Sequence, residues 1–132
     1  MSTFKYQNYR TESGNGTMNW PSLNVKLALV SAAYAADDSH VYLSEVPGVL
    51  AISGAFTGLA IVGGFAIGAC PEFLLLRNDS EVAGAILFDD TGVTSTSRLI
   101  AFSNDGPGFP FKPVGFNYTI TYNAIDGGWF QT

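Results

Sequence analysis

The chain has 132 residues, the usual size of one domain, and only 13% of them are charged, about half of the ~25% typical of soluble proteins. Its net charge of −5 comes from eleven acidic and six basic residues that form no runs, so it lacks the Lys/Arg cluster of a nucleic-acid-binding protein and we expect no nucleic-acid partner. Apolar residues, counted with Gly and without Tyr, make up 71 of the 132 residues, about 54%, above the ~45–50% typical on the same definition. This surplus predicts that part of the surface is buried against other chains, unless Ser, Thr and Asn supply a polar surface.

Residues 1–22 are polar and aromatic and show no clear period, which predicts an extended N-terminal arm with a turn at Ser13–Gly16 and no signal peptide. Tyr6, Tyr9 and Trp20 give this arm apolar surface to bury. Two arrangements fit: the arm packs on its own domain, or it lies across a neighbouring subunit.

Residues 23–132 form the predicted β domain. Leu23, Val25, Leu27 and Leu29 alternate with polar or small residues, the period of a half-buried strand. The following loop carries Asp37–Ser39, which could cap a short helical turn over residues 40–46.

The stretch from Val46 to Pro71 contains no ionisable side chain apart from a single thiol, and it exceeds the roughly 20 residues of a membrane-spanning helix. Six glycines interrupt it, each costing a helix about 1 kcal/mol relative to Ala, and its flanks are acidic rather than basic. Gly63-Gly64 between two short apolar runs indicates a hairpin with a type I′ turn. We therefore expect buried strands here and no membrane association.

Further strands are expected from β-branched and aromatic runs bounded by turn residues, and a Pro/Gly-rich loop separates two of them at residues 104–113. The runs are Phe73–Leu76, Val82–Phe88, Arg98–Ser103, Phe116–Tyr122 and Trp129-Phe130. About eight short strands and at most one short helix predict an all-β fold, a single-domain antiparallel β-sandwich or jelly-roll-like structure.

The sharpest catalytic motif is Asp90-Thr91-Gly92 after an apolar strand, which resembles the active-site loop of retroviral-type aspartic proteases. The extra Asp89 before the motif and Val93 after it depart from that family, and Asp, Thr and Gly also favour ordinary turns. The motif is thus better explained as a turn, and the protease is a minor alternative.

The chain has one histidine, His40, and one cysteine, Cys70, which cannot form a zinc site without carboxylates. Beside Pro71 in an apolar run, the cysteine is expected to be a buried core thiol. We predict no catalytic, cofactor-binding or metal-binding residues, and a protein that is not an enzyme.

Three segments resemble small virion-associated proteins of tailed bacteriophages: NVKLALVSAAY at Asn24–Tyr34 followed by Asp37-Asp38, SHVYLSEVP at Ser39–Pro47, and AILFDDTGVTSTSRLIAF at Ala85–Phe102. The resemblance implies a structural component of the phage particle, in the first place a head decoration (cement) protein. Such a protein is made in the bacterial host cytoplasm and sits on the capsid surface. Its partners would be the major capsid protein and copies of itself, as a homotrimer. A tail, neck or baseplate protein is the alternative.

A cement protein joins capsid subunits through apolar and aromatic surface. The partner contacts are expected in the aromatic arm and in the Pro/Gly/Phe loop, at Tyr6, Tyr9, Trp20, Phe109 and Phe111. Self-packing of these aromatic side chains is the alternative explanation for each of them.

Overall fold

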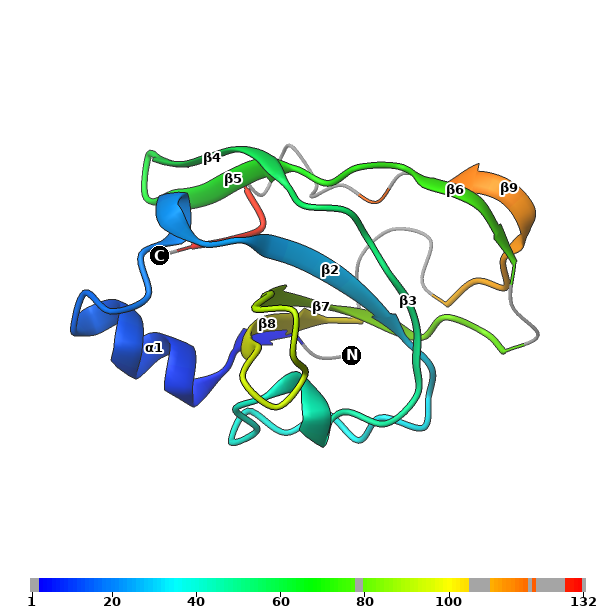
Figure 1. The fold of residues 1–132 in the computed structure, drawn as a ribbon, viewed down its shortest axis with the longest axis horizontal. Coiled ribbons are helices and arrows are strands. Elements are labelled where there is room, and N and C mark those ends of the chain that lie inside the picture. The colour runs from blue at the N-terminus through cyan, green and yellow to red at the C-terminus, as the bar shows by residue number, and fades with distance from the viewer. Residues whose placement is uncertain (1–2, 78–79, 105–109, 119, 121–127, 132) are drawn as a thin grey trace.

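Ten strands form three antiparallel sheets in a computed structural model that describes residues 3–77, 80–104, 110–118, 120 and 128–131 (Figure 1). The five-stranded sheet has the order β1-β8-β7-β2-β3, with β1 Thr3–Lys5, β8 Arg98–Ser103, β7 Gly84–Asp89, β2 Val25–Val30 and β3 Val49–Ile52. The second sheet has the order β10-β5-β4, with β10 Phe130–Gln131, β5 Phe65–Ala69 and β4 Thr57–Val62. The third pairs β6 Phe73–Arg77 with β9 Val114–Tyr118. The predicted all-β, sandwich-like fold is confirmed.

The five-stranded sheet is covered on both faces. Because the side chains of a strand alternate between the two sides of its sheet, each strand contributes residues to both covered faces. Val25, Leu27 and Leu29 of β2 face a first core beneath the two smaller sheets, whereas Ala28 and Val30 face a second core on the opposite side. Figure 1 shows the hairpin β4–β5 and the pair β6–β9 along one side of this sheet, and the segment between β2 and β3 along the other. The strand predicted to be half-buried is therefore buried on both faces, apart from the partly exposed Lys26.

The second core is closed by residues 31–48, which lie across the sheet as an irregular layer. This layer contributes Tyr34, Leu43 and Val46 to the core. The expected helical turn is only a 3₁₀ turn, η2 Leu43–Glu45, and it is not capped by the predicted acidic residues. Instead, the Glu45 carboxylate accepts hydrogen bonds from the backbone N–H groups of residues 41 and 42, both at 3.1 Å.

The charge-free stretch forms β3, β4 and β5, as its glycines indicated. Gly63 and Gly64 have φ values of 58° and 83°, and Val62 pairs with Phe65 on either side of them. Positive φ at both central residues is the requirement of a type I′ hairpin, so this prediction is confirmed. The expected burial is wrong for β3 and β4, whose residues are exposed or only half-buried, and in β5 only Ala66 is buried. No helix in the described ranges is both long and apolar enough to span a membrane.

The N-terminal segment is structured rather than extended. It contains β1, the helix α1 Gln7–Gly14 and a 3₁₀ turn, η1 Trp20–Ser22. Of the turn predicted at Ser13–Gly16, the first two residues end the helix and the last two form a turn. Strand β1 pairs with the edge of β8, and the Tyr6 N–H donates a 3.0 Å hydrogen bond to the carbonyl oxygen of Ile100, the extra residue where the β7–β8 register shifts. A β-bulge therefore helps to anchor the segment.

Candidate interaction surfaces

The three aromatic residues predicted as partner contacts in the arm are buried in this chain's own cores. Exposed fractions are 0% for Tyr6, 3% for Tyr9 and 1% for Trp20. The rings of Tyr9 and Trp20 meet the Phe130 ring edge-on at 5.6 and 5.3 Å, and the Trp20 indole N–H donates to the carbonyl oxygen of Ile67 at 2.9 Å. Of the two arrangements considered for the arm, the structure contains the packing of the arm on its own domain.

The other two predicted partner contacts lie in the Pro/Gly/Phe loop. Phe109 lies outside the described residues. Phe111 is half-buried, its ring stacks on Tyr118 at 5.1 Å between centroids, and its backbone exchanges two hydrogen bonds with Val82. These contacts hold the end of this loop against the segment that leads into β7.

The Asp90-Thr91-Gly92 motif closes the turn between β7 and β8. The Asp90 carboxylate lies 2.7 Å from the Lys26 ammonium of β2 and accepts the Gly92 N–H at 3.0 Å. The lysine is the main reason why the pKa of Asp90 lies below its usual value, and the Gly92 N–H acts in the same direction. An aspartic-protease carboxylate instead shares a proton with a second one, which raises the pKa of one of the two. Asp90 therefore stabilises the β7–β8 turn through the Gly92 N–H and links this turn to β2 through Lys26.

The lone histidine belongs to a chain of hydrogen bonds that the sequence did not reveal. The Tyr6 hydroxyl lies 2.8 Å from the Tyr34 hydroxyl, which lies 2.9 Å from Nδ1 of His40. Burial is the largest cause of the raised pKa of both tyrosines. These residues come from the arm and from the irregular layer, so the chain of bonds joins two segments of the second core.

The lone thiol is positioned as a core group rather than as a nucleophile. Cys70 is buried, and its burial raises the pKa of the thiol to about 11. At neutral pH the group is therefore almost entirely protonated, and the thiolate is the reactive form. Across the described part of the chain, no three His, Cys, Asp or Glu side chains are grouped as metal ligands would be.

Exposed apolar side chains remain as the candidates for contact with other molecules. Five large ones stand out among the described residues: Ile52, Ile61, Val62, Val93 and Val114. None of them was predicted individually, although the surplus of apolar residues predicted such a surface. The first three lie in the charge-free stretch, on β3 and β4.

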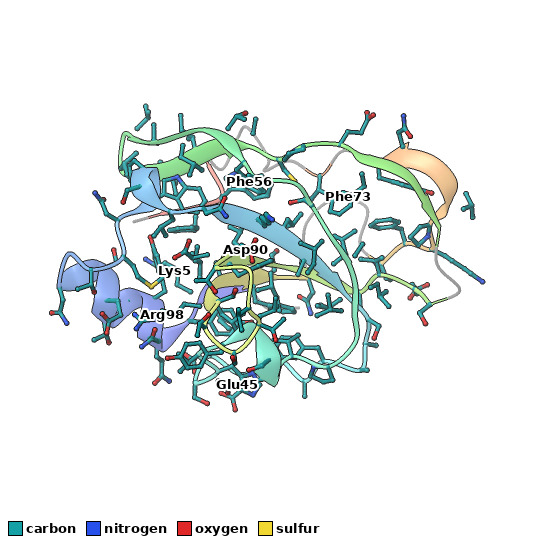
Figure 2. The ribbon with its side chains drawn as sticks, viewed as in Figure 1. Lys5, Glu45, Phe56, Phe73, Asp90 and Arg98 are labelled. Atoms are coloured by element: carbon teal, nitrogen blue, oxygen red, sulfur yellow. The ribbon has the colours of Figure 1, made fainter. Side chains whose placement is uncertain are left out.

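Figure 2 shows the side chains on the two sides of the five-stranded sheet. Phe56 and Phe73 lie on the side of the smaller sheets, in the first core, and Glu45 lies at the opposite side of the five-stranded sheet.

Comparisons with protein-family models, with curated proteins and with solved structures found no match to this chain.

Proposed function

We propose that this chain is a non-enzymatic structural protein of a tailed-bacteriophage particle. In this proposal it is a decoration (cement) protein that binds the outer surface of the head and stabilises contacts between major capsid protein subunits. Self-association, as a homotrimer, is part of the same proposal. The observation that carries it is that the three sequence segments that resemble phage virion proteins come together in space as one unit.

The contacts between these segments are continuous. Strand β2, from the first segment, pairs with β7 over its whole length, and β7 pairs with β8, both from the third segment. The second segment is bonded to the third through Leu43 N–H to the Ser97 oxygen at 2.9 Å and through Leu99 N–H to the Val41 oxygen at 2.8 Å. A resemblance that follows one physical unit is better support than three unrelated fragments would be.

The engagement of the potentially reactive side chains also supports a structural role. Asp90 is bound to Lys26, His40 is bound to Tyr34, and the Cys70 thiol is held protonated by burial. Each of these groups has a position that helps to hold the fold. A cement protein needs such a rigid scaffold and an apolar surface, and repetition on a lattice adds avidity to weak contacts.

Particles of the phage that encodes this chain provide the test. We expect an antibody against the chain to label purified particles across the head surface. In particles made without the chain, the heads should rupture at a lower temperature or after a milder osmotic shock. Purified protein added back should restore resistance to heat and osmotic shock in a saturable manner. A chain that is absent from washed particles would contradict the proposal.

The same labelling separates the alternative location. Signal confined to the tail, neck or baseplate would replace the cement assignment with a structural role at that site. Particles without the chain would then have intact heads and fail in tail attachment or adsorption. An unrelated, fluorescently labelled protein of similar mass, added to the particles in the same way, serves as the control for non-specific adsorption in the add-back experiment.

A further inference from the structure

The outer edge of β4 is the longest sheet edge among the described strands that lacks a blocking residue. In the described sheets β4 pairs only with β5, so in its regular part, from Ala60 to Val62, alternate backbone N–H and C=O groups point away from the sheet. The other long side of that sheet ends in β10, which has two residues, and β1 has three residues and includes Lys5. Natural edge strands are usually blocked by Lys, Pro, an inward charge or a β-bulge. β4 contains none of the first three, and its register shift lies between Thr57 and Ala60, before the regular part of the strand.

The last two side chains of this strand are apolar and exposed, whereas Leu59 and Ala60 are half-buried. Ile61 is 42% exposed and Val62 is 57% exposed, and the adjoining Gly63-Gly64 turn is also exposed. Ile52, at the end of the preceding strand β3, is 47% exposed. Three of the five exposed large apolar side chains named above thus lie within one short part of the chain. Ile61 and Val62, as successive residues of β4, expose apolar surface on the two opposite faces of this edge.

The geometry of the hairpin shows which part of β4 can accept another strand. The register with β5 shifts between Thr57 and Ala60, so the first half of β4 is irregular. From Ala60 to Val62 the ladder is regular, and Val62 closes the hairpin with Phe65. Because backbone groups alternate along a strand, the N–H and C=O of Ile61 point to the free edge. A strand added here would be centred on Ile61.

We propose that a second copy of this chain binds at this edge, with its own β4 running antiparallel. Ile61 then lies opposite the partner's Ile61, and Ala60 lies opposite the partner's Val62, so that one contact surface serves both copies about a twofold axis. The two β4–β5 sheets join into one continuous sheet. Exposed apolar side chains of both copies are then removed from water together.

Charge is the reason to assign the site to a second copy. Two chains of net charge −5 repel each other at most approaches, and the stretch from Val46 to Pro71 carries no charged side chain. Pairing along β4 therefore places no charged side chain of either strand opposite another. A basic or acidic partner protein would find no complementary charge there. This inference does not depend on the proposed role in a virion.

The test is the mass of the full chain in solution, measured by sedimentation velocity over a range of micromolar concentrations. We expect reversible pairing, as dimers of the single chain or as hexamers where the homotrimer of the proposed function also forms. We expect Ile61→Lys to raise the dissociation constant of this contact at least about tenfold, because a charge would be buried at its centre. Val93→Lys is the matched control, since Val93 is 55% exposed and lies in the β7–β8 loop. It should leave the dissociation constant unchanged.

A wild-type chain that is monomeric throughout would overturn the proposal, as would equal weakening by Val93→Lys. A trimer that Ile61→Lys does not dissociate would also overturn it, and would leave the homotrimer of the virion proposal in place. Far-ultraviolet circular dichroism and thermal unfolding establish that both variants are folded.

A second measurement does not depend on disrupting the contact. In a Cys70→Ala background, Ile61→Cys should cross-link to a covalent dimer with a short bismaleimide, because the two residues face each other across the twofold axis. Val93→Cys in the same background should remain a monomer. Equal cross-linking of the two variants, or none in either, would overturn the proposed register.

Discussion

At the scale of single residues, the hydrogen bond between the Tyr6 and Tyr34 hydroxyls in the second core predicts that the cost of removing a hydroxyl differs between the two residues. The Tyr6 hydroxyl is bound to Tyr34, and Tyr34 is also bound to His40, which is partly exposed to water. Removal of the Tyr34 hydroxyl would leave the Tyr6 hydroxyl buried without its hydrogen bond. We expect Tyr34→Phe to lower the free energy of unfolding by about 1–3 kcal/mol, and Tyr6→Phe to lower it by about 0.5–1.5 kcal/mol.

The double variant distinguishes this explanation from a simple sum of lost contacts. With both hydroxyls removed, no buried hydroxyl is left unsatisfied at Tyr6, so the cost should be smaller than the sum of the two single costs. Urea unfolding of the four chains measures the coupling. Additive effects would show that the hydroxyls do not interact in solution.

Asp90 gives a pH-dependent prediction. Its pKa in the folded chain is lowered by Lys26 and by the Gly92 N–H, so the ionised form is favoured by folding. The stabilisation is therefore present above the ordinary pKa of 3.8 and is lost as the pH falls through the lower folded pKa. Asp90→Asn should cost about 0.5–1 kcal/mol at pH 7, since the pair is partly exposed, and the cost should shrink as the pH falls below about 4.

Lys26 supplies the control for this prediction. In a Lys26→Gln background the main cause of the lowered pKa is gone, so Asp90→Asn should cost less at pH 7 than it does in the wild type. Urea unfolding at several pH values measures each difference. A cost that is independent of pH would mean that the Asp90 carboxylate acts through its shape and neutral hydrogen bonds alone.

At the scale of elements, Gly48 is where the irregular layer passes into β3. Its φ is +76°, and a Cβ atom there would lie 2.5 Å from Oγ of Ser31 and 3.2 Å from Cβ of Ala33. The Gly48 carbonyl also accepts the Ser31 N–H at 2.9 Å. We expect Gly48→Ala to lower the free energy of unfolding by about 2 kcal/mol, through backbone strain and the displaced serine.

Gly14, the last residue of α1, is the matched control. A Cβ there would meet no atom within 4 Å, so Gly14→Ala should be neutral or stabilising by up to about 1 kcal/mol. Thermal unfolding of both variants gives the comparison. Equal destabilisation would show that the position of Gly48 is not special.

The elements that the sequence predicted are those specified by local chemistry. The alternation in β2 and the Gly63-Gly64 turn depend on neighbouring residues only. The turn was correct in position, and the strand predicted over Leu23–Leu29 is found at Val25–Val30. Strand β1 and helix α1 were missed because neither carries a clear period: β1 has three residues, and α1 buries one residue, Tyr9, against Phe130 at the other end of the chain.

Contacts between distant segments account for the other differences. The second face of β2 is buried because residues 31–48 fold back over it. The apolar Ala28 and Val30 on this face are compatible with burial, but the strand does not show which segment covers it. Likewise, Tyr6 and Tyr34 lie 28 positions apart, so their hydrogen bond follows from the fold alone. The exposure of β4 depends on which strands pair, and a charge-free sequence does not show whether it lies in the core or at an edge.

At the scale of the whole molecule, both cores are built from the N-terminal segment as well as from the β domain. Tyr6 completes the second core, whereas Tyr9, Met18 and Trp20 belong to the first. The ion pair between Glu12 and Arg98, at 3.6 Å, adds a polar link between α1 and β8. The predicted boundary at residue 22 thus marks a change in composition, but the segments on its two sides share both cores.

This sharing leads to a prediction about truncation. A chain of residues 23–132 would lose three large buried aromatic side chains and the β1 edge of the main sheet. Loss of one buried aromatic side chain typically costs about 3–5 kcal/mol, so three such losses approach or exceed the roughly 5–15 kcal/mol by which domains are stable. We therefore expect the truncated chain to lack a cooperative unfolding transition and to bind a hydrophobic dye, as measured by urea titration and dye fluorescence.

In the full chain, Trp20→Ala should lower the free energy of unfolding by about 3–5 kcal/mol, whereas Val93→Ala, at an exposed position, should change it by less than about 0.5 kcal/mol. A truncated chain that unfolds cooperatively at a midpoint near that of the full chain would show that residues 23–132 are a complete domain and that the arm is free to bind elsewhere.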